Sequence, residues 1–160
     1  MKHKMSMMPG LLFILVSVFA SCYGQSYSLG GGRLAGTWDA SVDITNCATG
    51  AVITSFKSIA NFNQGGTYMG ITAGTPPAKR SPELGVWKHI GENRYQFRFK
   101  TFHVLFGDQV THYDIVTHEI QLDPDNLHYS STGTSTRYTL VGDVVFSGCS
   151  TAVGTRMTLD

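Results

Sequence analysis

Residues 94–100, Arg-Tyr-Gln-Phe-Arg-Phe-Lys, alternate polar and aromatic side chains along their whole length. Successive side chains of a β-strand point to opposite faces, so Tyr95, Phe97 and Phe99 would share one face and the charged or amide side chains the other. Such a pattern is typical of an antiparallel sheet with one buried and one solvated face. This stretch therefore predicts a strand whose aromatic side is turned toward a core.

From Leu34 onward the chain keeps this strand-like character and shows no helical period. Runs rich in β-branched and aromatic residues are separated by turn sequences such as Gln64-Gly-Gly66 and Asp123-Pro-Asp-Asn126. The expected strands cover residues 34–46, 51–62, 66–73, 84–90, 93–105, 109–122, 126–140 and 144–159.

Short connections between these strands favour antiparallel neighbours. Antiparallel strands with one buried face either split into a sandwich or close on themselves, and closure removes the exposed sheet edges. The 160-residue length fits one domain, and a charged fraction of only 14% together with 18 glycines is typical of strands and tight turns. We therefore predict an all-β domain over residues 34–160, an eight-stranded antiparallel up-and-down barrel. The formal net charge of +1 gives no electrostatic reason to expect nucleic acid as a partner.

The first 22 residues have the order of a secretory signal peptide. Lys2 and Lys4 precede an apolar run at residues 11–20, and small residues follow. The apolar run is about half of the ~20 residues that a membrane-spanning helix needs. We therefore expect an exported protein, either periplasmic or extracellular.

The cleavage site leaves two alternatives open. Phe19-Ala-Ser-Cys22 resembles the cleavage box of bacterial lipoproteins, in which the cysteine carries lipid, although Phe replaces the commoner Leu. Ordinary cleavage after Ala20 or Gly24 is the other alternative. The Gly/Ser-rich residues 23–33 would be a flexible tether in the first case and a frayed N-terminus in the second. Contact with a membrane is expected only through a lipid on Cys22.

Two cysteines lie in the expected barrel. Cys47 ends the first expected strand, and Cys149 lies near the start of the last. These strands are neighbours in a closed barrel, so both cysteines would lie at the same end. An oxidising compartment favours a disulfide, which would be worth about 4 kcal/mol in the chain-entropy model. Two free thiols, or part of a metal site, are the alternatives.

The two ends of the barrel sequence resemble the calycin superfamily, which includes lipocalins, fatty-acid-binding proteins and avidins. Leu34-Ala-Gly-Thr-Trp38 is similar to their Gly-x-Trp signature, and Gly154-Thr-Arg156 stands where a cation packs across that Trp. The resemblance implies a secreted bacterial barrel of the lipocalin or avidin type, with structural roles for Gly36, Trp38 and Arg156. The uninterrupted meander looks more like avidin, yet we assign no residue of this chain to avidin's biotin-binding set.

A barrel interior that contains Tyr95, Phe97 and Phe99 would suit a small, largely apolar ligand. The alternative is an interior filled by its own side chains. In avidin-like barrels the loop that corresponds to residues 75–82 covers the ligand. Lys79 and Arg80 in this loop would then meet an anionic group, whereas a solvated surface loop is the simpler interpretation.

His112, Asp114 and His118 share one face of the sixth expected strand. At two and six residues from His112, the other two side chains would lie about 7 and 20 Å away along the strand. His112 and Asp114 would be able to share a proton or a metal ion. Histidines that line a wet barrel mouth are the simpler interpretation, and they too would be ligand-binding candidates.

Three functional hypotheses follow from the sequence. The first is an exported, lipocalin-like binding protein that holds a small hydrophobic or amphipathic molecule. The second is a protein-binding module such as a secreted protease inhibitor, whose N-terminal tail would contain residues 26–29. The third is a barrel isomerase or cyclase that uses His112 and Asp114. The sequence contains no nucleophile elbow, phosphate-binding loop or zinc-ligand spacing, so it gives no support for a cofactor, a metal site or catalysis.

Overall fold

The structure, a computed structural model, describes residues 32–106 and 109–159. The expected signal peptide, the lipidation candidate Cys22, the tail residues 26–29 and most of the tether lie outside these residues.

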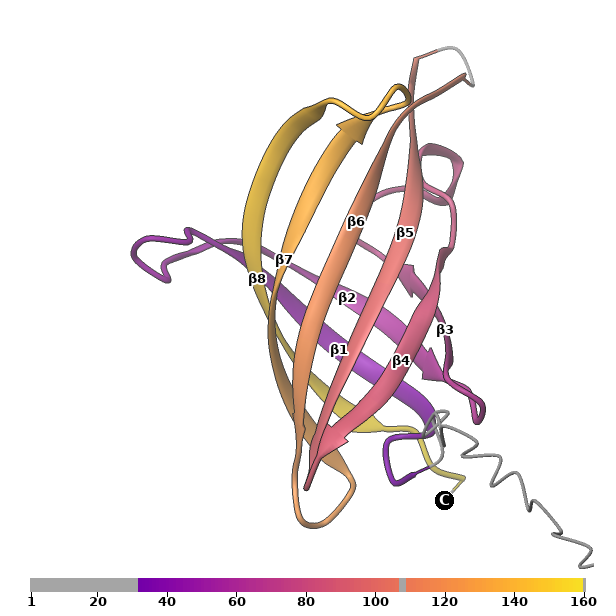
Figure 1. Cartoon of the computed structure of the whole chain (residues 1–160), viewed down its shortest axis with the longest axis vertical. Helices are drawn as coiled ribbons and strands as arrows, with labels where there is room; N and C mark the ends of the chain where they lie inside the picture. Colours follow the sequence, from indigo (N-terminus) through magenta and orange to yellow (C-terminus); the bar gives the residue numbers. More distant parts are fainter. Residues whose placement is uncertain (1–31, 107–108, 160) are drawn as a thin grey trace, which may run out of the picture.

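Eight antiparallel strands form one closed barrel in which each strand pairs with the next and the last pairs with the first (Figure 1). The strands are β1 (Gly36–Thr45), β2 (Val52–Phe62), β3 (Thr67–Thr72), β4 (Glu83–Gly91), β5 (Arg94–Phe106), β6 (Gln109–Leu122), β7 (His128–Thr139) and β8 (Val144–Arg156). A short 3-10 helix, η1 (Pro77–Lys79), lies in the β3–β4 connection. The predicted fold class is confirmed. The largest difference between expected and observed strand ends is at the end of β8, expected at residue 159 and observed at Arg156.

The alternation seen in the sequence places the aromatic side chains inside. Tyr95, Phe97 and Phe99 are 2%, 7% and 7% exposed, and their neighbours Arg94 and Arg98 are exposed. The predicted strand with a buried aromatic face is therefore confirmed at residues 94–100.

The lower end of the barrel is closed by side chains from both ends of the domain. Trp38 is fully buried, and its indole Nε1–H donates a hydrogen bond to the Leu34 carbonyl at 3.0 Å. The Arg156 guanidinium carbon lies 4.3 Å from the centroid of the Trp38 ring, a cation–π contact, and Arg156 Nη1 donates to the Ala35 carbonyl at 2.7 Å. Gly36 has a φ of 141°, and a Cβ at this position would collide with the Arg156 guanidinium, so glycine is required here.

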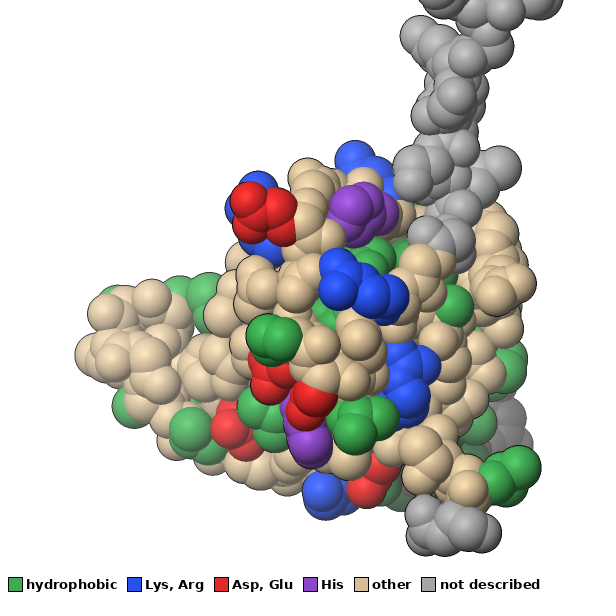
Figure 2. All heavy atoms as spheres, turned by 90° about the horizontal axis from the view of Figure 1, so that it is seen from below, with side chains coloured by type: hydrophobic (Ala, Val, Ile, Leu, Met, Phe, Trp, Pro, Cys, Tyr) green, Lys and Arg blue, Asp and Glu red, His purple; other side chains and the backbone are tan. Residues whose placement is uncertain are grey.

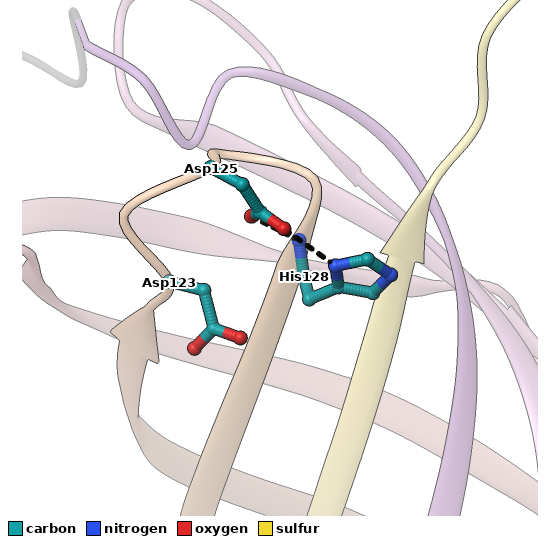
Figure 3. Close-up of side chains that lie close together, drawn as sticks. All are labelled: Asp123, Asp125 and His128. Carbon is teal, nitrogen blue, oxygen red and sulfur yellow. Dashed lines mark hydrogen bonds and ion pairs between the residues drawn. The ribbon is translucent and has the colours of Figure 1, made fainter.

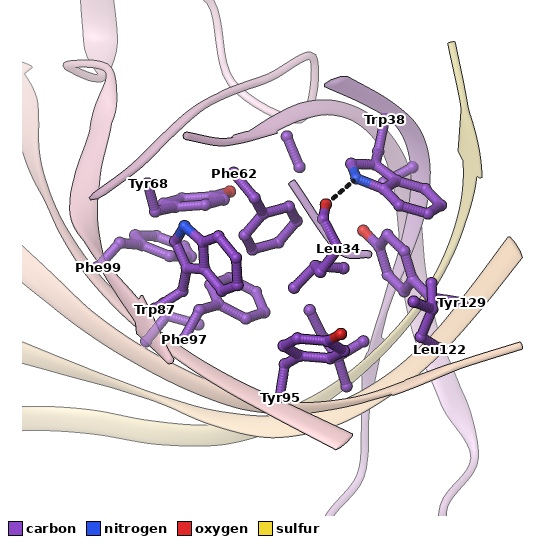
Figure 4. Close-up of a cluster of buried hydrophobic side chains, with 14 residues drawn as sticks. Leu34, Trp38, Phe62, Tyr68, Trp87, Tyr95, Phe97, Phe99, Leu122 and Tyr129 are labelled. Carbon is purple, nitrogen blue, oxygen red and sulfur yellow. Dashed lines mark hydrogen bonds between the residues drawn. The ribbon is translucent and has the colours of Figure 1, made fainter. Parts of the chain in front are cut away.

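Above this seal lies a cluster of aromatic rings that fills the lower half of the barrel (Figure 4). Phe62 is at its centre, and its ring centroid lies 5.2 Å from that of Tyr68, 5.9 Å from Trp87, 5.3 Å from Phe97 and 6.4 Å from Tyr129. The last three are edge-to-face contacts and the first is tilted, and such contacts add to the stabilisation from burial. The lower half of the interior is therefore a packed core.

The outer surface of the closed end carries charges of both signs. In Figure 2, Lys and Arg side chains are interspersed there with acidic and histidine side chains. No single-sign patch is visible on the described part of this face.

Cys47 and Cys149 form a disulfide with a Cα–Cα distance of 5.2 Å. The β1–β8 register pairs Thr45 with Cys149, which brings Cys47 at the start of the β1–β2 connection beside the same strand. The predicted disulfide is confirmed, and it fits an oxidising compartment. Within residues 32–106 and 109–159, no helix has the length and apolar character needed to cross a membrane.

Candidate functional site

A cavity of about 260 Å³ occupies the upper half of the barrel, above the aromatic core. All eight strands and the β3–β4 connection contribute to its wall. The polar and aromatic-hydroxyl lining residues are Ser58, Tyr68, Thr75, Arg80, Glu83, His103, Asp114, His118, Tyr129, Ser135, Arg137 and Ser150. The apolar lining includes Ala40, Val42, Ile44, Phe56, Ala60, Phe97, Phe99, Val116, Phe146 and Ala152.

Aromatic side chains line one wall of the cavity, and small side chains line the wall across the barrel. The Phe99 ring is stacked against those of Tyr68 and Phe97, with centroid distances of 5.3 and 6.1 Å, and the Tyr68 and Phe97 centroids are 4.9 Å apart. Strands β1 and β8 lie across the barrel from β5 and present Ala40 and Ala152 to the same space. The space exists because these short side chains do not reach the aromatic wall.

The first polar cluster joins three neighbouring strands. Arg137 on β7 binds the Asp114 carboxylate of β6 through two nitrogens, Nε to Oδ1 at 2.8 Å and Nη2 to Oδ2 at 3.0 Å. His103 on β5 places Nε2 2.7 Å from Asp114 Oδ2. Burial alone would raise the pKa of Asp114, but the hydrogen bonds from His103 and Arg137 outweigh it and lower this pKa to about 2. Asp114 is therefore ionised at neutral pH.

The partner of Asp114 differs from the sequence-based hypothesis. His112 is on the same strand, but its Nδ1 lies 3.0 Å from the Thr111 hydroxyl, and it is not part of the cavity lining. The strand register instead pairs Asp114 with Arg137 and brings His103 alongside from β5. A proton or a metal ion shared between His112 and Asp114 has no support in this arrangement.

The second polar cluster lies on β3 and β4. Arg80 in the β3–β4 connection places Nη2 2.9 Å from Glu83 Oε1, and the Tyr68 hydroxyl donates to Glu83 Oε2 at 2.8 Å. Burial raises the pKa of Glu83 and of Tyr68. The connection is held against β5, where Arg80 Nε donates to the Thr101 hydroxyl at 3.3 Å. Of the two basic residues expected in a ligand-covering loop, Arg80 lines the cavity, whereas Lys79 is exposed.

His118 lies deep in the barrel rather than at its mouth. Its Nδ1 is 3.0 Å from the Ser131 hydroxyl and its Nε2 is 2.8 Å from the Ser150 hydroxyl. Gly133 makes room for the imidazole on the neighbouring strand, because a Cβ there would collide with the ring. Burial lowers the pKa of His118 to about 4, so this side chain is neutral at pH 7.

Protonation of His118 is expected to destabilise the fold. Its pKa is about 4 in the folded protein and 6.5 in an unfolded chain, so the stability contributed by the neutral ring is complete above pH 6.5 and is lost as the pH falls to 4. The expected loss is about 3 kcal/mol. Urea unfolding at pH 7 and pH 4.5 measures it. His118→Gln should remove most of this dependence, whereas His128→Gln, at an exposed position, should keep it. Equal pH dependence in both variants would contradict the prediction.

Asp123, Asp125 and His128 gather in the β6–β7 turn at the closed end, where their potential ligand atoms all lie within 4.8 Å of one another (Figure 3). All three are exposed. The Asp125 carboxylate accepts hydrogen bonds from the Leu127 backbone N–H at 2.7 Å and from His128 Nδ1 at 2.9 Å. These turn contacts account for the cluster, so it is not assigned as a metal site.

The remaining predicted ligand-binding residues lie at different depths in the barrel. Phe97, Phe99, Asp114 and His118 line the cavity. Tyr95 lies below it, with its ring centroid 5.9 Å from that of Trp87.

Two charged residues of the lining, Glu83 and Arg137, were not predicted from the sequence, and neither was the position of His103. Glu83 is an even number of residues from the buried Trp87 on β4, so both side chains share the inner face. Arg137 stands in the same relation to the buried Tyr129 on β7. This alternation would have identified both as inward-facing. Nothing in the local sequence indicates that they form ion pairs with Arg80 and Asp114.

Comparisons with protein-family models, with curated proteins and with solved structures gave no match for this chain. The closed up-and-down barrel is consistent with a calycin-like fold. The functional conclusion therefore rests on the cavity and the residues that line it.

Proposed function

We propose that this protein binds a small amphipathic molecule inside its barrel. The observation that supports this proposal is the unfilled upper half of the interior, with an aromatic wall on one side and convergent polar groups around it. Concave, largely apolar sites with a few placed polar groups are the usual form of small-molecule pockets. Larger side chains at Ala40, Ala60 and Ala152 would fill an eight-stranded barrel, as happens in barrels with no ligand.

We also propose that the protein acts after export, as a member of the secreted bacterial calycins. The signal-like first 22 residues and the Cys47–Cys149 disulfide support an oxidising location outside the cytoplasm. The mass of the mature protein distinguishes a free form from one anchored by a lipid on Cys22.

Native mass spectrometry of the mature protein, purified from its own envelope or medium, tests the binding proposal. We expect a non-covalent mass that is lost on denaturation. Ala152→Leu fills the cavity from β8 and should reduce ligand occupancy at least tenfold. Val153→Leu changes the outward-facing neighbour, which is 60% exposed, and should retain wild-type occupancy. The denatured mass also reports the two hydrogens lost in the disulfide and any lipid on Cys22.

Two results would count against ligand binding. One is a wild-type protein that carries no ligand and gains none when small amphipathic compounds are added. The other is a bound mass that Ala152→Leu leaves unchanged, because such a ligand would lie outside the cavity.

A further inference from the structure

The charged side chains that line the cavity are already paired with one another. Among the described residues, the arginines and carboxylates of the lining number two each, and each arginine contacts a carboxylate within 3.0 Å: Arg80 with Glu83 and Arg137 with Asp114. His103 also lines the cavity, with its Nε2 2.7 Å from Asp114 Oδ2. The side chains of Glu83 and Asp114 are only 6% and 9% exposed. The formal charges of these four residues therefore sum to zero within the cavity wall.

This pairing disfavours a charged ligand of either sign. The charges of Arg80 and Arg137 are already balanced by Glu83 and Asp114, so a carboxylate or phosphate would add an uncompensated negative charge to a largely buried site. A cationic ligand would likewise add an uncompensated positive charge. An uncompensated buried charge is strongly unfavourable.

The shape of the cavity favours a flat ring. The ring planes of Tyr68 and Phe99 differ by 23° and those of Phe97 and Phe99 by 20°, whereas those of Tyr68 and Phe97 differ by 40°, so the three rings form a compact aromatic surface on one side of the cavity. Offset stacking on such a surface is favourable for another planar ring. At about 260 Å³ the cavity is smaller than the ~300–1,000 Å³ of pockets that hold drug-sized ligands, so it suits a small ligand.

Two hydroxyl groups in the lining are free to bind a ligand. In residues 32–106 and 109–159, neither the Tyr129 hydroxyl nor the Ser135 hydroxyl has a hydrogen-bond partner within the protein. Tyr129 is near the start of β7 and Ser135 lies six residues along the same strand, about 20 Å away. They therefore offer hydrogen bonds at the deep end and at the upper end of the cavity. A hydroxyl both donates and accepts, so either end can meet a ligand hydroxyl, carbonyl or amide.

We infer that the ligand is a small, uncharged, planar ring compound with hydrogen-bonding substituents, which lies against Phe97 and Phe99 in the charge-balanced cavity. This inference rests on the proposed function. It adds that the two internal ion pairs act as a filter against ionised ligands.

Three matched probes test the filter by isothermal titration calorimetry at pH 7. They are 2,6-dihydroxynaphthalene, 6-hydroxy-2-naphthoate and 6-(aminomethyl)-2-naphthol, which share a ring system and differ in charge at one position. We expect the neutral diol to bind at least tenfold more tightly than the anion or the cation. Tyr129→Phe should weaken binding of the diol several-fold.

Removing one carboxylate from the cavity wall should change which probe binds more tightly. Asp114→Asn leaves Arg137 without its carboxylate, and we expect it to raise the affinity of the naphthoate relative to the diol at least tenfold. Glu83→Gln does the same at Arg80 and gives a second test in case the first variant does not fold. Glu119→Gln makes the same charge change on the exposed face of β6 and should leave the wild-type preference unchanged.

The outcomes separate the inference from the proposed function. If the naphthoate or the amine binds the wild-type protein as tightly as the diol, and Ala152→Leu blocks all of them, the charge filter is wrong but binding in the cavity stands. A charge preference that neither Asp114→Asn nor Glu83→Gln alters would also overturn the filter. If Ala152→Leu leaves binding of every probe unchanged, the probes lie elsewhere and the cavity proposal itself fails.

Discussion

Replacing Cys47 and Cys149 together by serine is expected to lower the free energy of unfolding by about 4–5 kcal/mol. The two cysteines are 102 residues apart, so the disulfide closes nearly the whole barrel sequence into one loop. In the chain-entropy model this restricts the unfolded chain and so stabilises the folded state. Cys47 is exposed, so the loss of packing at this position contributes little.

Urea unfolding of the wild-type and doubly substituted proteins measures this difference. Reduction of the wild-type protein with dithiothreitol should reproduce the effect, and the Cys47→Ser, Cys149→Ser protein should not respond to dithiothreitol. A difference below about 1 kcal/mol between the two proteins would show that the disulfide contributes little to stability, contrary to the ~4.7 kcal/mol expected for a loop of about this length.

Trp38→Ala is expected to destabilise the barrel by about 4 kcal/mol, within the range for deletion of a fully buried large aromatic side chain. Trp38 is 0% exposed, and its substitution removes the surface beneath Arg156 and the hydrogen bond to the Leu34 carbonyl. Trp38→Phe retains a ring beneath the guanidinium, so it should lower the stability of the barrel by about half as much.

The midpoint of urea unfolding distinguishes these variants, with Val153→Ala on the outer face of β8 as the surface control. Trp38 does not line the cavity, so the folded fraction of Trp38→Phe should bind ligand as the wild-type protein does. A Trp38→Ala protein as stable as the wild type would mean that the lower end of the barrel is not sealed by this contact.

The alternation in residues 94–100 was sufficient to predict the strand and its buried face, because the direction of a side chain on a strand is a local property. Closure could also be predicted, since short turns between successive strands permit few arrangements. Once closure is assumed, β1 and β8 must be neighbours. That adjacency favours the disulfide between Cys47 and Cys149, whereas the contact between Trp38 and Arg156 was expected from the resemblance to the calycin signature.

Depth within the barrel was not predictable from that alternation. Tyr95 and Phe97 have the same parity, yet Tyr95 belongs to the packed base and Phe97 to the cavity wall. His118 was expected at a wet mouth and lies instead between two serine hydroxyls. Alternation along a strand shows which side of the sheet a side chain faces. Its depth along the barrel axis depends instead on the tilt and stagger of all the strands.

The sequence by itself therefore determined the class of fold, the adjacency of the first and last strands and the aromatic face that points inward. Only the tertiary structure decided which inward-facing residues meet. Asp114 binds Arg137 and His103 rather than His112, because contacts across strands depend on register, and the β5–β6 register shifts beside His103. Arg80 reaches Glu83 only because the β3–β4 connection folds against β5. Such contacts join residues from different strands, and the local pattern of a single strand contains no information about its partners' register.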